Sequence, residues 1–177
     1  MTFERYLQQR ERDVPQEVYL SLLGIFVVGS TIFLCWKGKK RGAKLSLYLL
    51  GSEYIFLIYC ITVIYRRTKD ICKFDLTPFW SWREIFNGKM NLMHENIMNI
   101  VMFVPIGLMV GILFSEYNWK KVFIIGTCIS IGIEILQFIF SKGFSEFDDV
   151  MHNALGCMVG YLIACCFIKR PNKLSIQ

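Results

Sequence analysis

Hydrophobic residues in this chain are gathered in long runs that polar or charged segments separate. We identify five runs, at residues 17–36, 45–65, 97–115, 122–140 and 147–168. Each is close to the length of about 20 apolar residues that a helix needs to cross a bilayer. Apolar residues fill these runs instead of forming one stripe per helix, which is typical of membrane-spanning helices. The pattern therefore predicts an all-α membrane bundle of five transmembrane helices.

The runs divide the chain into four segments. We expect a polar N-terminal segment at 1–16, two transmembrane helices in 17–65, a region with three further transmembrane helices at 66–168, and a basic tail at 169–177. The first run has no small-residue cleavage site behind a short apolar core, so we expect an anchor and not a removed signal peptide. No stretch is left over for a second, soluble domain.

The long loop between the second and third runs contains one further predicted helix. Thr77-Pro78 resembles a cap followed by a first-turn proline. Helical spacing then relates a series of apolar residues: Phe79, Trp82, Phe86, Met90 and Met93. We expect a short interfacial or re-entrant helix at 78–87, with its aromatic side in the headgroup zone; a loop packed over the bundle is the alternative.

The distribution of basic residues predicts the orientation in the membrane. The segment at 37–44, KGKKRGAK, is dense in Lys and Arg, and so basic a short loop should stay cytoplasmic. This places the N-terminus outside and the C-terminus in the cytoplasm. The net charge of +6 does not indicate a nucleic-acid partner, because the basic residues flank the runs and form no face with interleaved aromatic residues. Membrane lipids are the expected surroundings.

The fourth run carries an acid and an amide at membrane depth, Glu134 and Gln137. A carboxylate there costs roughly 3 kcal/mol or more unless it faces protein or water. Helical spacing puts five polar residues on one face of the predicted helix: Thr127, Ser130, Glu134, Gln137 and Ser141. We therefore look for function along this stripe.

Neighbouring runs bring further polar residues to the same depth. Predicted spans three and five run in one direction and span four runs against them, so the start of the first two lies beside the end of the third. This places one cluster in one half of the bilayer, which faces outward in the expected orientation: Asn96, Asn99, Glu134, Gln137, Asp148, Asp149 and Asn153, with His152 nearby. We expect Ser145 to cap the last helix.

Three functions are compatible with this cluster. It can be interhelical hydrogen bonding that holds the bundle together, worth about 0.6–2 kcal/mol per bond. It can be a pocket for a polar head group or a small molecule. It can be an active site, with Glu134 or Asp149 as general base or with Asp148, Asp149 and His152 as ligands of a hard metal. No serine–histidine, HExxH or CxxC pattern supports catalysis, so we expect no catalytic residue, metal or cofactor.

Small residues predict where helices approach closely. Gly107 and Gly111 form one GxxxG pair and Gly156 and Gly160 another. Pro105 is expected to kink the third span, because its ring removes one backbone hydrogen bond. The seven cysteines have no metal-type spacing and are expected to pack as small hydrophobic residues.

Four motifs in order resemble the VanZ-like family of membrane proteins. They are DLTPF at 75–79, NxxNIVMFVPIG at 96–107, IEILQF at 133–138, and FDDVMHNALG at 147–156. The resemblance implies a bacterial cell-membrane protein, and the founding member of the family is associated with resistance to the glycopeptide teicoplanin. It brings no established catalytic activity, and we expect the pocket to bind a glycopeptide, a lipid-linked cell-wall precursor or a lipid head group. The alternatives are a membrane enzyme acting on lipid or wall intermediates and a structural or partner-binding subunit.

Overall fold

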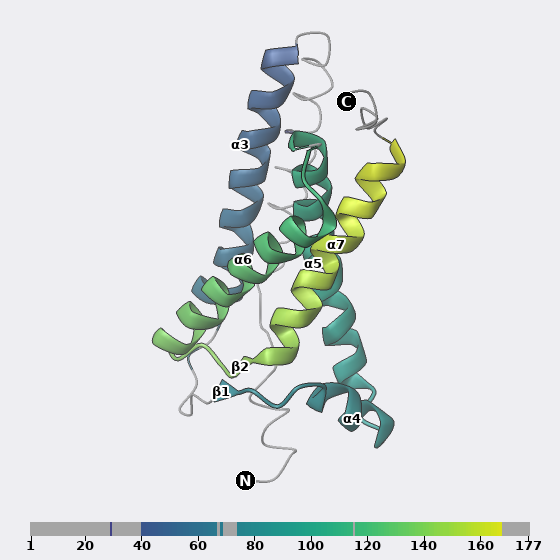
Figure 1. The fold of residues 1–177 in the computed structure, drawn as a ribbon. Coiled ribbons are helices and arrows are strands. Elements are labelled where there is room, and N and C mark those ends of the chain that lie inside the picture. The colour runs from purple at the N-terminus through teal and green to yellow at the C-terminus, as the bar shows by residue number, and fades with distance from the viewer. Residues whose placement is uncertain (1–28, 30–39, 67, 69–73, 115, 168–177) are drawn as a thin grey trace.

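The computed structural model describes residues 40–66, 74–114 and 116–167, together with Gly29 and Thr68. Four long helices form most of this part of the chain (Figure 1): α3 at Lys40–Tyr59, α5 at Asn91–Leu113, α6 at Trp119–Ile139 and α7 at Phe147–Phe167. Each has a stretch long and apolar enough to cross a membrane. The expected all-α membrane bundle is therefore confirmed for the second to fifth runs. The predicted first span at 17–36 lies outside the described residues, apart from Gly29.

Helices α5 and α7 form the most extensive interface in the described part and run in the same direction. Gly156 lies against the backbone of Ile100, and Gly160, one turn later, lies against the backbone of Val104. Gly126 of α6 meets Cys157, and α6 runs against the other two, as Figure 1 shows. These relative directions are the ones that place all the predicted polar residues at one end of the bundle.

The predicted small residues of α5 face α7. A methyl group at Gly107 would overlap the carbonyl oxygen of Cys157, and one at Gly111 would lie 2.6 Å from Cβ of Ala164. Close backbone approach of this kind increases dispersion contact where lipid provides no hydrophobic driving force. Pro105 lies inside α5, which continues without interruption through it.

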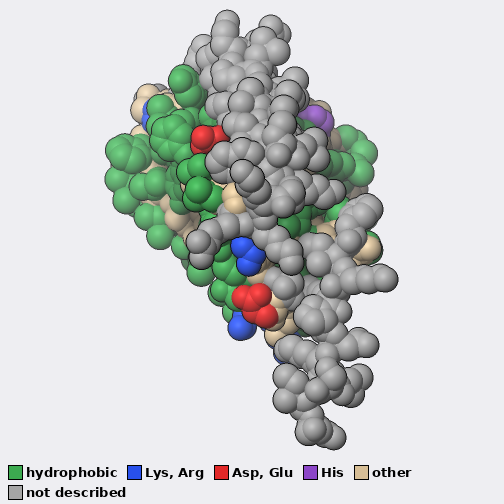
Figure 2. Space-filling model, turned by 90° about the horizontal axis from the view of Figure 1, so that it is seen from above, with side chains coloured by type: hydrophobic (Ala, Val, Ile, Leu, Met, Phe, Trp, Pro, Cys, Tyr) green, Lys and Arg blue, Asp and Glu red, His purple; other side chains and the backbone are tan. Residues whose placement is uncertain are grey.

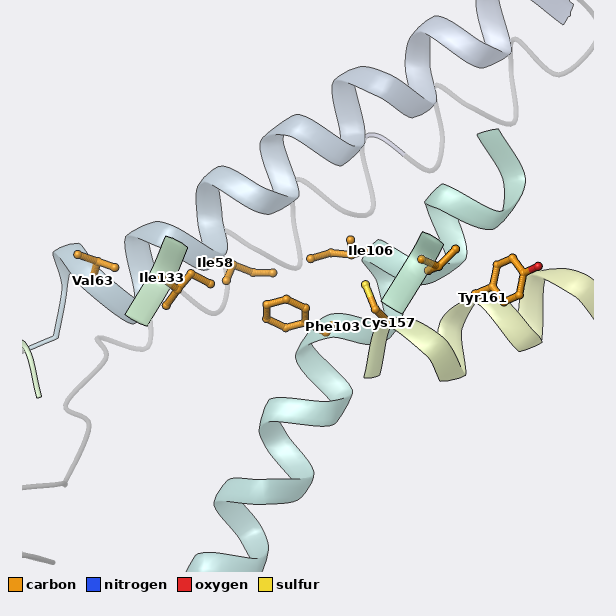
Figure 3. Close-up of a cluster of buried hydrophobic side chains, with 8 residues drawn as sticks. Ile58, Val63, Phe103, Ile106, Ile133, Cys157 and Tyr161 are labelled. Carbon is orange, nitrogen blue, oxygen red and sulfur yellow. The ribbon is translucent and has the colours of Figure 1, made fainter. Parts of the chain in front are cut away.

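A hydrophobic core lies where α3, α5, α6 and α7 meet (Figure 3). Phe103 of α5 is fully buried at its centre, between Ile58 of α3, Ile133 of α6 and Cys157 of α7. The outward faces are also apolar: Phe56, Ile124 and Leu162 all have exposed side chains. In the view from above, hydrophobic side chains cover much of the visible described surface (Figure 2). Apolar outer faces are what a bundle surrounded by lipid requires.

Several helix ends differ from the sequence-based expectation. The described part of α3 starts at Lys40, so the segment expected to be a loop is helical from that residue onward. Helix α5 begins at Asn91 and not near 97, because Leu92 is fully buried and packs the extra turns against the protein. Helix α6 ends at Ile139, and Ser141 follows with a positive φ of 54°. Ser141 therefore does not belong to the helical stripe.

The polar end of the bundle is closed by short elements. Helix α4 spans Trp80–Phe86, which confirms a short helix in the long loop. Asn87 ends it and Gly88 has a φ of 97°, so Met90 and Met93 do not continue its pattern. Strand β1 at Phe74–Asp75 pairs in parallel with β2 at Ser145–Glu146. A π-helical segment, η1 at Cys60–Ile64, ends α3.

Candidate functional site

The predicted polar residues meet in pairs across helices at one end of the bundle. Asn99 of α5 donates a hydrogen bond from Nδ2 to Oδ1 of Asp149 on α7, at 2.6 Å. Asn153, one turn further along α7, donates from Nδ2 to Oγ of Ser130 on α6, at 2.8 Å. Oδ1 of Asn153 has no hydrogen-bond partner among the described residues. These two contacts tie α7 to both of its neighbours.

Glu134 is bonded to the segment that leads into α7. Its Oε2 accepts from the backbone N–H of Glu146 at 3.1 Å, and its carbonyl accepts from Oγ of Ser145 at 2.8 Å. The expected role of Ser145 as a helix cap is therefore wrong, because its hydroxyl is directed to α6. The side chain of Glu134 lies close enough to Asp149, Arg66 and Glu146 to interact with them electrostatically.

Gln137 is held by the chain that follows α3. Nη1 of Arg66 donates to its Oε1 at 2.7 Å, and its Nε2 donates to the carbonyl of Thr62 at 3.2 Å. Thr62 lies in η1, whose wider turn ends the helix just before Arg66. The guanidinium of Arg66 also packs on Gly143, where an added methyl group would lie 2.9 Å from its Cζ.

Asp148 anchors the short helix α4. Its Oδ1 accepts from the backbone N–H of Phe79 at 2.6 Å, and its Oδ2 accepts from the N–H and the Oγ of Ser81, at 3.0 and 2.6 Å. Asn96 completes the contact by donating to Ser81 Oγ at 3.1 Å. The first N–H groups of a helix need acceptors from outside it. Asp148 supplies them from α7, so the cap expected from Thr77-Pro78 is wrong.

A second contact joins α4 to α7. Nε1 of Trp82 donates to Nε2 of His152 at 2.9 Å, while Nδ1 of His152 is buried without a partner among the described residues. Phe79, which directly precedes this short helix, and Phe86 at its end remain exposed. At its far end, Glu84 accepts a hydrogen bond from the ammonium of Lys89, which lowers the pKa of the Glu84 carboxyl below its usual value.

Charged groups are concentrated in this end of the bundle. Four carboxyl groups are buried, those of Glu134, Glu146, Asp148 and Asp149, and Arg66 is the buried cationic side chain among the described residues. Buried charges are tolerated only when paired, hydrogen-bonded or facing a polar cavity. Such a group of acceptors suits a ligand that carries hydrogen-bond donors. No set of three His, Cys, Asp or Glu side chains in the described part is arranged to hold a metal ion, so the metal-ligand alternative is not formed.

A cavity of about 300 Å³ opens between α6 and α7. We call it the lateral groove. Glu134, Ser145 and Glu146 line one end of it, with their polar atoms buried behind a wall surface that is almost entirely apolar. Its other walls are mainly apolar and come from α6, the start of α7 and the segment around β1: Phe74, Leu76, Phe123, Thr127, Ile131, Ile135, Phe147, Val150 and Met151. Of the seven predicted pocket residues, Glu134 is the one that lines this groove.

The predicted residues therefore fall into two sets according to the elements that they hold together. Asn96 and Asp148 hold α4, while the other five link α5, α6, α7 and the end of α3: Asn99, Glu134, Gln137, Asp149 and Asn153. The sequence-based prediction missed Arg66, Ser81 and Glu146 as members. A signal for Arg66 was available, since it directly follows an apolar run. No comparable signal marked Ser81 or Glu146, apart from their positions close to predicted residues in the sequence.

Comparisons with known proteins agree with these features. A family model described as VanZ/LLP1 matches residues 45–169. A curated relative from Enterococcus faecium, named Protein VanZ, is 35% identical over 136 residues, which cover 75% of this chain and 78% of the relative. No solved structure shows a significant match to the chain.

Proposed function

The chain belongs to the VanZ family, and from this membership we propose that it is a multi-pass protein of a bacterial cell membrane that protects the cell against the glycopeptide teicoplanin. The four long apolar helices support a membrane location. In the proposed orientation the N-terminus is outside, the C-terminus is cytoplasmic, and the polar end of the bundle faces outward. A site that faces outward could be reached by a glycopeptide that arrives from outside the cell.

One observation carries the proposal: two of the buried acidic residues, Glu134 and Glu146, contribute to the wall of the lateral groove, both at the same end. We propose that this end is the ligand pocket. In this proposal the carboxyl groups of Glu134 and Glu146, which are buried behind the groove wall, turn toward the ligand and accept hydrogen bonds from its amide, hydroxyl or ammonium groups. A glycopeptide and a lipid-linked wall precursor both offer such donors. The remaining polar residues hold the walls of the pocket in place.

Conservative substitutions test the pocket. Glu134→Gln and Asp149→Asn remove charge but keep an acceptor for the bonds from Glu146 N–H and Asn99. We expect each variant, expressed in a susceptible host at the wild-type level, to leave the host as sensitive to teicoplanin as the empty vector does. Minimal inhibitory concentrations provide the measurement. Glu116→Gln is the matched control, because Glu116 is an exposed acid before α6, at the opposite end of that helix. Full protection by Glu134→Gln would exclude the pocket, because Glu134 lines the groove whereas Asp149 does not.

A structural role is the second candidate, and one observation favours it. Most of the polar cluster is bonded within the protein, as in Asn99–Asp149, Asn153–Ser130 and Asp148–Ser81. Interhelical bonds of this type stabilise membrane bundles. If this is the whole role, Asp149→Asn preserves protection while Gly156→Leu, which separates α5 from α7, abolishes it. An altered lipid or wall-precursor profile in a deletion strain would instead favour an enzyme.

A further inference from the structure

The lateral groove has the dimensions of a single hydrocarbon chain. Its α6 wall extends from Phe123 to Ile135, which at about 1.5 Å of helical rise per residue is roughly 18 Å. One leaflet of a bilayer has a hydrocarbon thickness of about 15 Å, half of the usual 30 Å. The cavity volume of about 300 Å³ is at the lower limit of ligand pockets, which range over roughly 300–1,000 Å³. Along α6 the groove therefore extends for about the length of an acyl chain within one leaflet.

The apolar side chains of the walls also favour a hydrocarbon occupant of the groove. Ile131 and Ile135 are partly exposed on the α6 wall, and Val150 and Met151 face them from α7. Water in such a space would lack the two to four polar partners that an ordered water needs. An empty groove would lose the dispersion contacts of its lining. Because α6 and α7 are both long enough to cross the bilayer, the acyl chains around them are the available filling.

The position of the groove along the helices gives the occupant a direction, because one end lies where α6 ends and α7 begins and is therefore nearest the membrane surface. Glu134, Ser145 and Glu146 lie at one end, beside the β1–β2 pair, and Phe123 and Thr127 lie toward the other. An amphiphile would place its polar part at the first end and its chain toward the second.

We propose that the lateral groove binds one acyl chain of a membrane phospholipid, with the glycerol and head group of that lipid at the Glu134–Glu146 end. This inference rests on the proposed function, because the Glu134–Glu146 end of the groove is the proposed pocket. It adds that the pocket opens sideways into the bilayer, so its ligands enter from the membrane and not directly from water. A resident lipid would have to leave, or share the groove, when another amphiphile binds.

Photo-crosslinking tests the proposal on the full-length protein in lipid nanodiscs. The probe is a phosphatidylcholine with a diazirine midway along one acyl chain, and labelled peptides are identified by mass spectrometry. We expect labelling of the 147–151 segment to exceed that of Leu162 and Ile163, which are exposed on α7 outside the groove. Equal labelling of the two segments would overturn the proposal, because it would indicate only general contact with lipid.

Filling the groove with a side chain provides the decisive comparison. Ile131→Trp is expected to lower labelling of the 147–151 segment by about tenfold, a change that corresponds to about 1.4 kcal/mol of binding free energy. Ile124→Trp is the matched control, because Ile124 is an exposed isoleucine of the same helix that does not line the groove. Ile135→Trp, on the same wall, replaces Ile131→Trp if that variant does not fold. Unchanged labelling in the folded groove variant overturns the proposal.

Two further results separate this inference from its alternatives. A chemical cross-link between residues 1–39 and Met151, with no lipid label there, would show that another segment of the chain fills the groove. Teicoplanin susceptibility of Glu134→Gln reports on the proposed function, whereas labelling by phosphatidylcholine reports on the groove. Wild-type labelling with no protection would reject the function alone, and protection without labelling would reject the groove alone.

Discussion

Replacing Gly156 by alanine is expected to destabilise the folded bundle by about 3 kcal/mol or more, at the upper end of what overpacking usually costs. The added methyl group would overlap the carbonyl oxygen of Ile100 and lie 2.9 Å from its carbonyl carbon. Both atoms belong to the backbone of α5, which cannot rotate away as a side chain can. Relief requires α5 and α7 to separate, and their interface is the largest in the described part of the chain.

Unfolding of the purified protein in mixed micelles measures this effect, with helical circular dichroism as the signal while a denaturing detergent is increased. Gly51→Ala is the matched control, because its new methyl group would lie 3.7 Å from Sδ of Met109, an ordinary contact. Alanine is favoured over glycine in a helix by up to about 1 kcal/mol, so this variant should keep or increase stability. Equal stability of Gly156→Ala and wild type would contradict the packing described for α5 and α7.

The helices and their directions could be predicted because they depend on local properties of the sequence. Hydrophobic runs of sufficient length give the spans, and consecutive spans alternate in direction. These two facts already place Asn99, Glu134 and Asp149 in one half of the bilayer. The GxxxG spacing of Gly156 and Gly160 likewise indicates close approach from one helix alone, although it does not identify α5 as the neighbour.

The partners of the polar residues could not be predicted, because they depend on contacts between distant parts of the chain. Asp148 binds Ser81, which is 67 positions away, and Gln137 binds Arg66, which is 71 away. Local signals even favoured other solutions: Thr77-Pro78 has the features of a helix cap, yet Asp148 supplies the acceptors. A local sequence pattern can indicate a cap at the start of a helix. The tertiary structure determines which acceptor actually reaches the first N–H groups of that helix.

The groove between α6 and α7 could not be predicted from the sequence either. It depends on how the two helices pack against each other and on the β1–β2 pair at one end. Among the residues around the groove, Thr127 and Ser145 had been named for other reasons, and Glu134 was the one predicted as a pocket residue. A polar residue in an apolar run indicated where to look, because such a residue is costly unless it faces protein or a cavity. The structure provides both for Glu134: the backbone of Glu146 on one side and the groove on the other.

Asp148→Ala is expected to release α4 from the bundle. The variant would leave three donors without their acceptor: the backbone N–H groups of Phe79 and Ser81 and the hydroxyl of Ser81. An unsatisfied buried polar group costs about 1–3 kcal/mol, so the free energy of locally opening α4 should fall by about 3 kcal/mol or more. Helix α4 has only seven residues and depends on such outside contacts, because isolated helices so short are marginal in water.

Hydrogen exchange of the amides in α4 measures this release, because exchange of a protected amide reports on local opening. Asp75→Ala is the matched control: Asp75 also accepts from a backbone N–H in this region, that of Thr77, but in an exposed turn. It should leave exchange in α4 nearly unchanged. The amides of α6 should stay protected in both variants, because Asp148 makes its described bonds to α4. Retained protection of α4 in Asp148→Ala would mean that the Trp82–His152 contact and the packing on α5 suffice, and would remove Asp148 as its anchor.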